Sequence, residues 1–286
     1  MAFPRSLPRA HEKNERLEEE IARRQIDSDH GRRCEIRCGC RAPAGVTDPG
    51  HNAKAIPMKK KILVIDIGGS NVKLMISRAK KLKFTSGSRL TPREMVAQMK
   101  PLVSDWKFDA ISMGFPAPVR DGRILSEPKH LGKGWVGFNF EKALGKPVRI
   151  INDAAMQALG SYHGGRMLFL GLGTGLGSAL VWDNYVLPLE LGDLPYRNGS
   201  IIEADLGKPG LARLGEKTWR RDVKHALVQL KKSLIADYIV LGGGNAKKLD
   251  MLPVGVERGH NRNAFLGGTR LWQIDSHTRR PKWRIL

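Results

Sequence analysis

The sequence of 286 residues predicts an α/β protein of two related lobes. Two observations support this fold class. Three β-type runs, a helical segment and a further β-type run follow one another after Ile62, and the same order returns after Val148. In addition, three glycine-rich loops each follow an apolar β-type run, at the strand ends where open α/β sheets bind ligands.

Composition divides the chain into an extension, two lobes and a tail. Residues 1–57 are expected to be an N-terminal extension without structure, because Arg, Pro, Gly and Ala dominate most of them. Residues 58–147 are expected to form the N-terminal lobe, 148–272 the C-terminal lobe and 273–286 a basic tail. We also expect Met58 to be the natural start. Mass spectrometry of the native N-terminus tests this, since peptides from before Met58 would contradict it.

The net charge of +21 predicts an anionic partner or substrate. Residues 1–57 hold 11 Lys and Arg against 9 Asp and Glu, so they contribute only +2, and the remaining residues contribute +19. The excess therefore belongs to the folded part. No apolar run is long enough to span a bilayer, so no membrane contact is expected.

Cysteine usage indicates a reducing compartment, and we expect a cytoplasmic protein. Cys34, Cys38 and Cys40 all lie in the first 57 residues, and the rest of the chain has no cysteine. They resemble part of a metal site, but neither a fourth cysteine nor a well-spaced histidine completes it, and no zinc is predicted.

Local patterns predict the elements of the first lobe. Apolar, largely β-branched runs predict strands at residues 62–65, 72–76, 82–85 and 110–113. The first two form a hairpin around Gly68-Gly69. A helix starts with Thr91 as N-cap, Pro92 at its first position and Glu94 closing a capping box. Its apolar face consists of Met95, Met99, Leu102 and Val103.

The second lobe repeats the order with strands, a helix and a last strand. The strands are expected at residues 148–151, 167–170, 178–182, 185–187 and 239–241. The helix covers 216–233 and has an apolar side of Trp219, Val223, Ala226, Leu227 and Leu230. Its basic side is one candidate track for a polyanion, unless these charges merely form a solvated helix face.

The first glycine loop has two interpretations. It is either an ordinary hairpin turn or a phosphate loop, in which the N–H groups of Gly68, Gly69, Ser70 and Asn71 surround a phosphate. In the second case Asp66 would face Mg²⁺ or its water.

Two further loops are candidates for phosphate or nucleotide contacts. Residues 171–177, with Gly173, Thr174 and Gly175 at the centre, lie between two strands and match neither a Walker nor a Rossmann pattern. The third loop, Gly242, Gly243 and Gly244, follows a strand, and the residues after it could start a helix whose N-terminus faces an anion. A plain turn is the alternative.

Asn152 and Asp153 stand at a strand-to-helix junction, where an Asx residue usually caps the helix. The presence of three glycine loops in the same chain favours a catalytic role for this pair. An acceptor hydroxyl needs a positioned carboxylate to take its proton, and the phosphates need donors and a metal to spread their charge. The combination predicts a phosphotransferase.

Seven segments share their pattern and order with one known family. They are DIGGS at 66–70, LGKGW at 131–135, INDA at 151–154, LGLGTGLG at 170–177, ELG at 190–192, VLGGG at 240–244 and NAFLGG at 263–268. With them, residues 61–272 resemble the ROK family of sugar kinases, closest to its polyphosphate glucokinase branch. The resemblance implies the two-lobed actin-like ATPase (ribonuclease H-like) α/β fold, in which each lobe is a mixed sheet flanked by helices and the active site lies in the cleft.

The resemblance also implies roles for single residues. Asp153 would be the catalytic base, Asn152 and Glu190 would hold the sugar, and Lys133 would lie in the loop over it. Mg²⁺ would assist, with ATP or inorganic polyphosphate as the phosphoryl donor and glucose O6 as the acceptor. Departures concern the sugar site, because Asp193 replaces a usual histidine and His130 a common asparagine. The family's cysteine-rich zinc motif is absent after residue 190.

Alternatives stay open. One is a ROK kinase for another hexose or an amino sugar, such as mannose, fructose or N-acetylmannosamine. Another is a sugar-sensing or nucleic-acid-binding protein on this fold, although the basic stretches lack the interleaved aromatic residues of single-strand binders. The sequence leaves a homodimer open.

Overall fold

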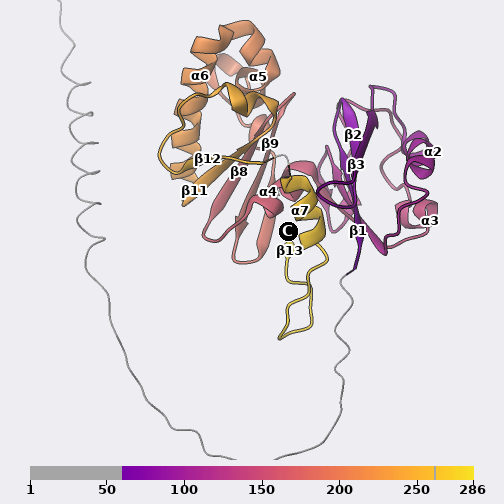
Figure 1. Cartoon of the computed structure of the whole chain (residues 1–286). Helices are drawn as coiled ribbons and strands as arrows, with labels where there is room; N and C mark the ends of the chain where they lie inside the picture. The colour runs from indigo at the N-terminus through magenta and orange to yellow at the C-terminus, as the bar shows by residue number, and fades with distance from the viewer. Residues whose placement is uncertain (1–59, 261) are drawn as a thin grey trace, which may run out of the picture. The chain divides into compact units, whose positions relative to one another are not determined.

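The computed structural model describes residues 60–260 and 262–286, so the predicted extension and its cysteines lie outside the described residues. Two mixed sheets form the framework, and helices α4 (Asp153–Ser161) and α7 (Asn263–Arg270) pack between them. Figure 1 shows helices α2 and α3 on the side of the first sheet that faces away from the second sheet.

The first sheet has five strands in the order β3-β2-β1-β4-β7. Their bounds are β1 Ile62–Ile67, β2 Asn71–Met75, β3 Lys81–Thr85, β4 Ala110–Phe115 and β7 Val148–Asn152. The predicted hairpin is confirmed, since β1 and β2 pair antiparallel. A separate two-stranded hairpin, β5 (Val119–Arg120) and β6 (Arg123–Ile124), turns at Asp121 and Gly122, which both have positive φ.

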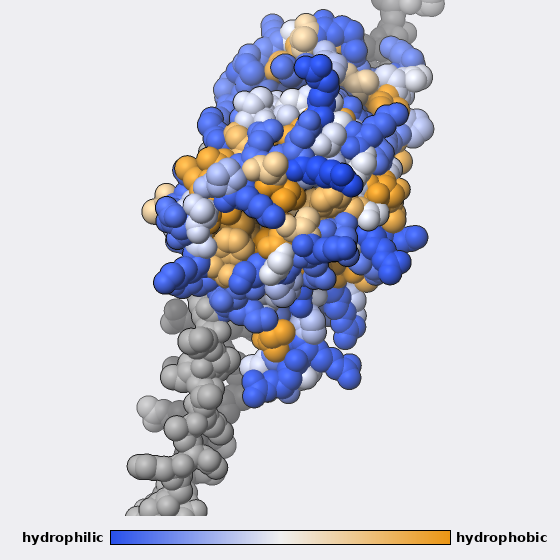
Figure 2. Space-filling model, turned by 90° about the vertical axis from the view of Figure 1, so that its right-hand side faces the viewer, coloured by the Kyte–Doolittle hydropathy of each residue, from blue (hydrophilic) through white to orange (hydrophobic). Residues whose placement is uncertain are grey.

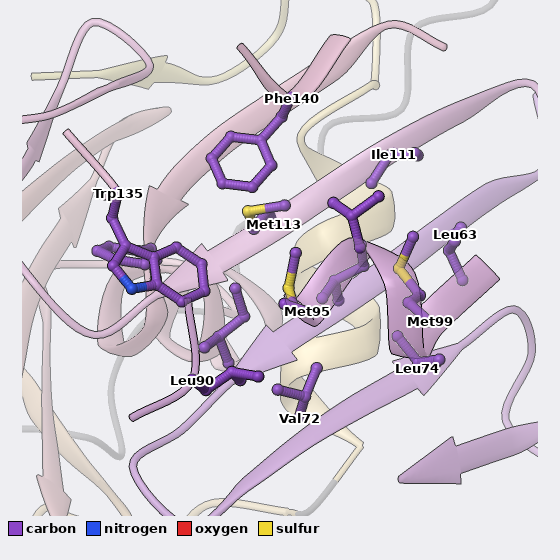
Figure 3. Close-up of a cluster of buried hydrophobic side chains, with 14 of the residues drawn as sticks. Leu63, Val72, Leu74, Leu90, Met95, Met99, Ile111, Met113, Trp135 and Phe140 are labelled. Carbon is purple, nitrogen blue, oxygen red and sulfur yellow. The ribbon is translucent and has the colours of Figure 1, made fainter. Parts of the chain in front are cut away.

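The core of the first lobe lies between this sheet and helices α2 (Pro92–Leu102) and α3 (Phe140–Leu144). Figure 3 shows Met95 and Met99 of α2 with Trp135, Phe140 and strand residues such as Leu63 in this cluster. The capping box at Thr91 is confirmed. Leu102 was expected on the buried face but is 40% exposed, because the helix ends there, and Val96 is buried in its place.

The second sheet has six strands in the order β12-β11-β8-β9-β10-β13. Their bounds are β8 Met167–Leu172, β9 Leu176–Trp182, β10 Tyr185–Leu189, β11 Tyr238–Gly242, β12 Val256–Arg258 and β13 Arg284–Ile285. Helices α5 (Ile202–Leu206) and α6 (Lys208–Ser233) pack against it. The backbone of α6 breaks at Gly215, where φ is 73°, so its long segment starts at Glu216, as the sequence predicts.

The internal repeat is present, but its second copy starts later than predicted. The order β3-β2-β1-β4-β7 corresponds to β10-β9-β8-β11-β12, so the second copy begins with β8 at Met167. Strand β7 pairs in parallel with β4 and completes the first sheet. The predicted lobe boundary between residues 147 and 148 is therefore wrong, because an apolar run does not reveal which sheet it joins.

Residues 273–286 also differ from the expected basic tail. Strand β13 pairs in parallel with β10, and Trp283 is buried among residues of the central core. The apolar side chains of Trp283 and Ile285 hold this segment in place, although basic residues dominate its composition.

Ile235 lies just after α6 and has φ of 51°, a left-handed conformation that β-branched residues disfavour. Its side chain is 72% exposed, so its burial contributes little. Ile235→Gly should raise the free energy of unfolding by about 0.5–1 kcal/mol, measured by urea denaturation. Ile235→Val, which keeps the branched Cβ, is the control and should give no gain. Equal stability of Ile235→Gly and the wild type would contradict the strain.

Among residues 60–260 and 262–286, no helix has the length and apolarity needed to cross a membrane. Figure 2 shows one face of the molecule, on which apolar residues gather near the centre and hydrophilic residues surround them.

Candidate active site

A pocket of about 440 Å³ lies where the strand ends of both sheets meet the start of α4. The first lobe contributes Gly68, Gly69 and His130 to its lining, among others. The second lobe contributes the loop from Gly171 to Gly177, together with Gly243. The pocket therefore brings together the glycine loops that are far apart in the sequence.

Asn152 and Asp153 have different roles at the junction of β7 and α4. Asn152 is the N-cap, since its Oδ1 accepts the N–H of Ala155 at 3.1 Å. The carboxylate of Asp153 is thus not needed as the cap and lines the pocket, where its Oδ1 accepts the N–H of Ala154 at 2.8 Å.

The environment of Asp153 raises the pKa of its carboxyl from 3.8 to about 7. Burial is the largest cause, followed by the nearby carboxylate of Asp66, with a smaller contribution from Glu190. The Ala154 N–H bond and Lys73 act in the opposite direction. A carboxylate whose pKa lies near neutrality suits a general base.

The first glycine loop is tight, with the N–H of Gly68 donating to the carbonyl of Asn71 at 3.0 Å. A Cβ on Gly69 would lie 3.2 Å from that of His130, so glycine permits this close approach. Ser70 and Asn71, also predicted to contact phosphate, do not line the pocket.

Asp66 is buried below the first loop and does not line the pocket. Its Oδ2 pairs with Lys73 Nζ at 2.8 Å. No group of three or more metal-ligating side chains occurs in the described parts of the chain. Mg²⁺ usually keeps several waters and binds through one or two carboxylates and substrate phosphates. A buried carboxylate that is near the Asp153 carboxylate fits such an outer position.

The second and third glycine loops contact each other. Asn245 Nδ2 donates to the carbonyl of Gly173 at 3.1 Å. A Cβ on Gly243, where φ is 80°, would lie 2.3 Å from the carbonyl oxygen of Leu172, so this position requires glycine. Thr174 and Gly175 line the pocket, whereas Gly242 and Gly244 do not. Gly242 instead pairs with Gly171 within the sheet.

The helix expected after the third loop is the short 3₁₀ helix η3 (Gly244–Lys248). An α-helical N-terminus for an anion is therefore absent at this point of the described structure.

Acidic side chains also line the pocket, and one of them contacts the second glycine loop, since Glu203 Oε2 accepts the N–H of Leu176 at 3.0 Å. Glu190, Asp193 and Glu203 line the pocket together with Lys129. Lys129 Nζ lies 3.3 Å from Asp193 Oδ1 and 3.9 Å from Glu203 Oε1, and so joins the first lobe to the second. Burial, followed by the Asp193 carboxylate, raises the pKa of Glu190. These groups can accept hydrogen bonds from several hydroxyls.

The loop expected over the sugar is fixed by a residue that the sequence analysis missed. The carboxylate of Glu127 accepts the N–H groups of Gly134, Trp135 and Val136 at 3.1, 3.2 and 3.3 Å. His130 of this loop lines the pocket, whereas Lys133 does not. Lys129, Glu127 and Glu203 were not predicted, because no local pattern distinguishes them from surface charges.

Comparison with known proteins gives a consistent result. The model of the ROK family matches residues 62–188. A polyphosphate glucokinase of Mycobacterium leprae is 24% identical over 227 residues, which cover 71% of this chain and 69% of that protein.

Solved structures show the same architecture. The polyphosphate/ATP-glucomannokinase of an Arthrobacter strain superposes with a TM-score of 0.63 at 22% identity, covering 73% of this chain and 96% of that one. A ROK family glucokinase of Streptomyces griseus, solved with glucose and AMPPNP, gives 0.60 at 16% identity and covers 73% and 98%. The predicted actin-like ATPase fold is confirmed.

Proposed function

We propose that this chain, which carries a domain of the ROK family, is a sugar kinase that phosphorylates glucose at O6, with polyphosphate or ATP as the donor. One observation carries the proposal. Asp153, with a pKa of about 7, faces a pocket that is lined both by glycine loops and by the acidic side chains of Glu190, Asp193 and Glu203. Such a pocket suits an anionic donor and a polyhydroxylated acceptor.

The reaction is an in-line phosphoryl transfer. The ionised carboxylate of Asp153 takes the proton of the primary hydroxyl as that oxygen bonds to the terminal phosphorus of the donor. The bond from this phosphorus to the bridging oxygen breaks, and the shortened donor leaves with the electron pair. Asn152 and Glu190 orient the sugar. Mg²⁺, when bound near Asp66, would neutralise charge on the donor phosphates.

The choice of donor is supported by charge and by similarity. The +19 of residues 58–286 suits a polyanion. The similar mycobacterial protein is a polyphosphate glucokinase, and the similar Arthrobacter protein uses polyphosphate and ATP. Gly243 in the pocket lining keeps ATP as an option. Cytoplasmic location and the lack of zinc stay predictions based on the cysteine pattern.

The pocket residues specify the identity of the sugar less narrowly than the type of reaction. Asp193 and His130, the two departures from the family pattern, both line the pocket. Lys129 pairs with Asp193 there. A different hexose or an amino sugar is therefore the second candidate acceptor.

The test is sugar phosphate formation from glucose with Mg²⁺, with polyphosphate and ATP as parallel donors and Asp153→Asn as the control. We expect product with polyphosphate. Product with ATP alone would keep the kinase and reject the polyphosphate donor. No product with either donor from glucose, mannose, fructose or N-acetylmannosamine would reject the proposed function.

The pKa of Asp153 predicts the pH dependence. The base is active when it is ionised, so kcat/KM should rise with pH and level off above a midpoint near pH 7. Below the midpoint the rate should fall about tenfold per pH unit. Asp66→Asn removes the second-largest cause of the raised pKa and should move the midpoint to lower pH. Initial rates from pH 5 to 9 check this, and a wild-type midpoint near pH 4 would contradict the buried base.

A further inference from the structure

Three lysines on β2 and β3 lie on the same face of the first sheet as Asp66 of β1. In the register of the strands, Asp66 of β1 lies opposite Lys73 of β2, and Lys73 lies opposite Lys83 of β3. Lys81 lies two residues before Lys83 on β3, which is the edge strand of the sheet. Residues directly opposite each other, and residues two apart on a strand, point to the same face. All three lysines therefore share the face of Asp66.

The other face of these strands is occupied. Val72 and Leu74 are buried in the core beneath α2, and Phe84 packs against it. The lysines alternate with these residues and so lie on the face opposite α2, which in Figure 1 is the side turned toward the second sheet. Lys73, Lys81 and Lys83 are all exposed. The row starts beside the first glycine loop and ends at the edge of the sheet.

This arrangement costs stability in the absence of an anion. Cross-strand neighbours have Cβ atoms about 4.5–5.5 Å apart, and like charges there repel. Asp66 neutralises Lys73, but within residues 60–260 and 262–286 neither Lys83 nor Lys81 has a carboxylate within salt-bridge distance. Lysine protects an edge strand from pairing. Edge protection alone does not require a row that leads to a phosphate loop.

The basic side of α6, the track suggested by the sequence, is less suitable. Arg220 pairs with Glu216 and Asp250, and Arg221 pairs with Asp222. Neither the residues of α6 nor the three lysines line the pocket, but Lys73 pairs with Asp66, which lies two residues before Gly68 of the pocket lining.

We propose that Lys73, Lys83 and Lys81 form a phosphate track that holds the distal part of a polyphosphate chain whose terminal phosphate lies at the first glycine loop. This inference rests on the proposed function and specifies its donor site. Each phosphate of the polymer carries negative charge, so several units can be bound at once by weak, salt-sensitive contacts. ATP supplies only three phosphates, so it can make fewer of these contacts than a long polymer.

The test compares donors in the full-length protein with Lys81→Glu/Lys83→Glu. Lys73 is left intact because it pairs with Asp66. We expect KM for long-chain polyphosphate to rise at least about tenfold and kcat/KM with ATP or tripolyphosphate to stay within about twofold of the wild type. The loss should be larger at about 50 mM salt than at about 200 mM.

The matched control is Arg93→Glu/Lys100→Glu, which makes the same charge change at exposed positions of α2, under the opposite face. It should leave KM for polyphosphate within about twofold. An equal rise of KM in the control would mean that the effect depends only on net charge, and it would overturn the proposed track. Unchanged KM in Lys81→Glu/Lys83→Glu would also overturn it.

Direct binding separates failure of the track from failure of the proposed function. Equilibrium dialysis with long-chain polyphosphate should show weaker binding to Lys81→Glu/Lys83→Glu than to the control, even if no sugar is phosphorylated. Absence of polyphosphate binding to the wild type would overturn the proposal. Filter binding of double-stranded DNA at physiological salt is the last arm. The wild type could bind DNA tightly, and the two substitutions could abolish that binding without changing the binding of polyphosphate. This result would assign the lysine row to nucleic acid and would also overturn the proposed track.

Discussion

Replacement of Asp153 by Asn is expected to lower kcat by roughly 10²–10⁴ while the fold stays intact. The amide has nearly the shape of the carboxylate, but it cannot take the hydroxyl proton. The helix start survives, because Asn152 and not Asp153 caps α4. Steady-state rates with glucose at pH 8 measure the effect.

The same variant should be more stable than the wild type at pH 8. The folded-state pKa of Asp153 lies above its ordinary value of 3.8, so the folded protein holds this proton more tightly than the unfolded chain. The stability of the wild type therefore falls as the pH rises from about 4 to about 7. Asn does not ionise, so its gain in Tm should be largest above pH 7 and should shrink toward pH 4.

Asp183→Asn is the matched control for both readouts. Asp183 lies in the exposed turn between β9 and β10 with φ of 47°, which Asn tolerates well. It should keep the wild-type kcat and the wild-type pH dependence of Tm. Near-normal turnover of Asp153→Asn would remove Asp153 from the role of base.

Local signals in the sequence were sufficient for several elements. The capping box at Thr91, the β1–β2 hairpin and the start of the long α6 segment at Glu216 each depend on a few adjacent residues. The site residues in glycine loops and at the β7–α4 junction were found for the same reason. Asp153, Gly69 and Gly243 all line the pocket.

Long-range pairing was not accessible from the sequence. An apolar run predicts a strand but not its partner, so β7 was placed in the wrong lobe. Strand β13 has only two residues in a basic segment, and its pairing with β10 spans about a hundred residues. Lys129 can be recognised as a pocket residue only when the fold brings it to Asp193. Lys133 was predicted from its motif, yet Glu127 fixes this loop and His130 is the residue that reaches the pocket.

The glycines of α7 belong to a family motif, and the structure gives a physical reason for their presence. Residues 263–268 were noted for their resemblance alone, and the structure places them against α4. A Cβ on Gly267 would lie 1.7 Å from the carbonyl oxygen of Met156, and one on Gly160 would lie 1.8 Å from that of Asn263. The two helices therefore cross with their backbones in contact, and only glycine fits at the crossing.

Gly267→Ala should consequently lower the free energy of unfolding by about 3 kcal/mol or more, because backbone and not a flexible side chain blocks the added methyl group. For a protein of this size the loss corresponds to a fall in Tm of about 6–12 °C, measured by thermal unfolding. Gly244→Ala is the control, since a Cβ there meets no heavy atom within 4 Å, and its Tm should stay near that of the wild type.

The same substitution should reduce activity, although Gly267 does not line the pocket. Helix α7 supports α4, and the first residue of α4 is Asp153. A shift of α4 away from α7 would displace the base from the glycine loops, and displacements of about 1 Å are costly in catalysis. We expect kcat to fall in Gly267→Ala at temperatures where the protein is still folded. A variant with lowered Tm and unchanged kcat would show that the helix crossing stabilises the fold without positioning the base.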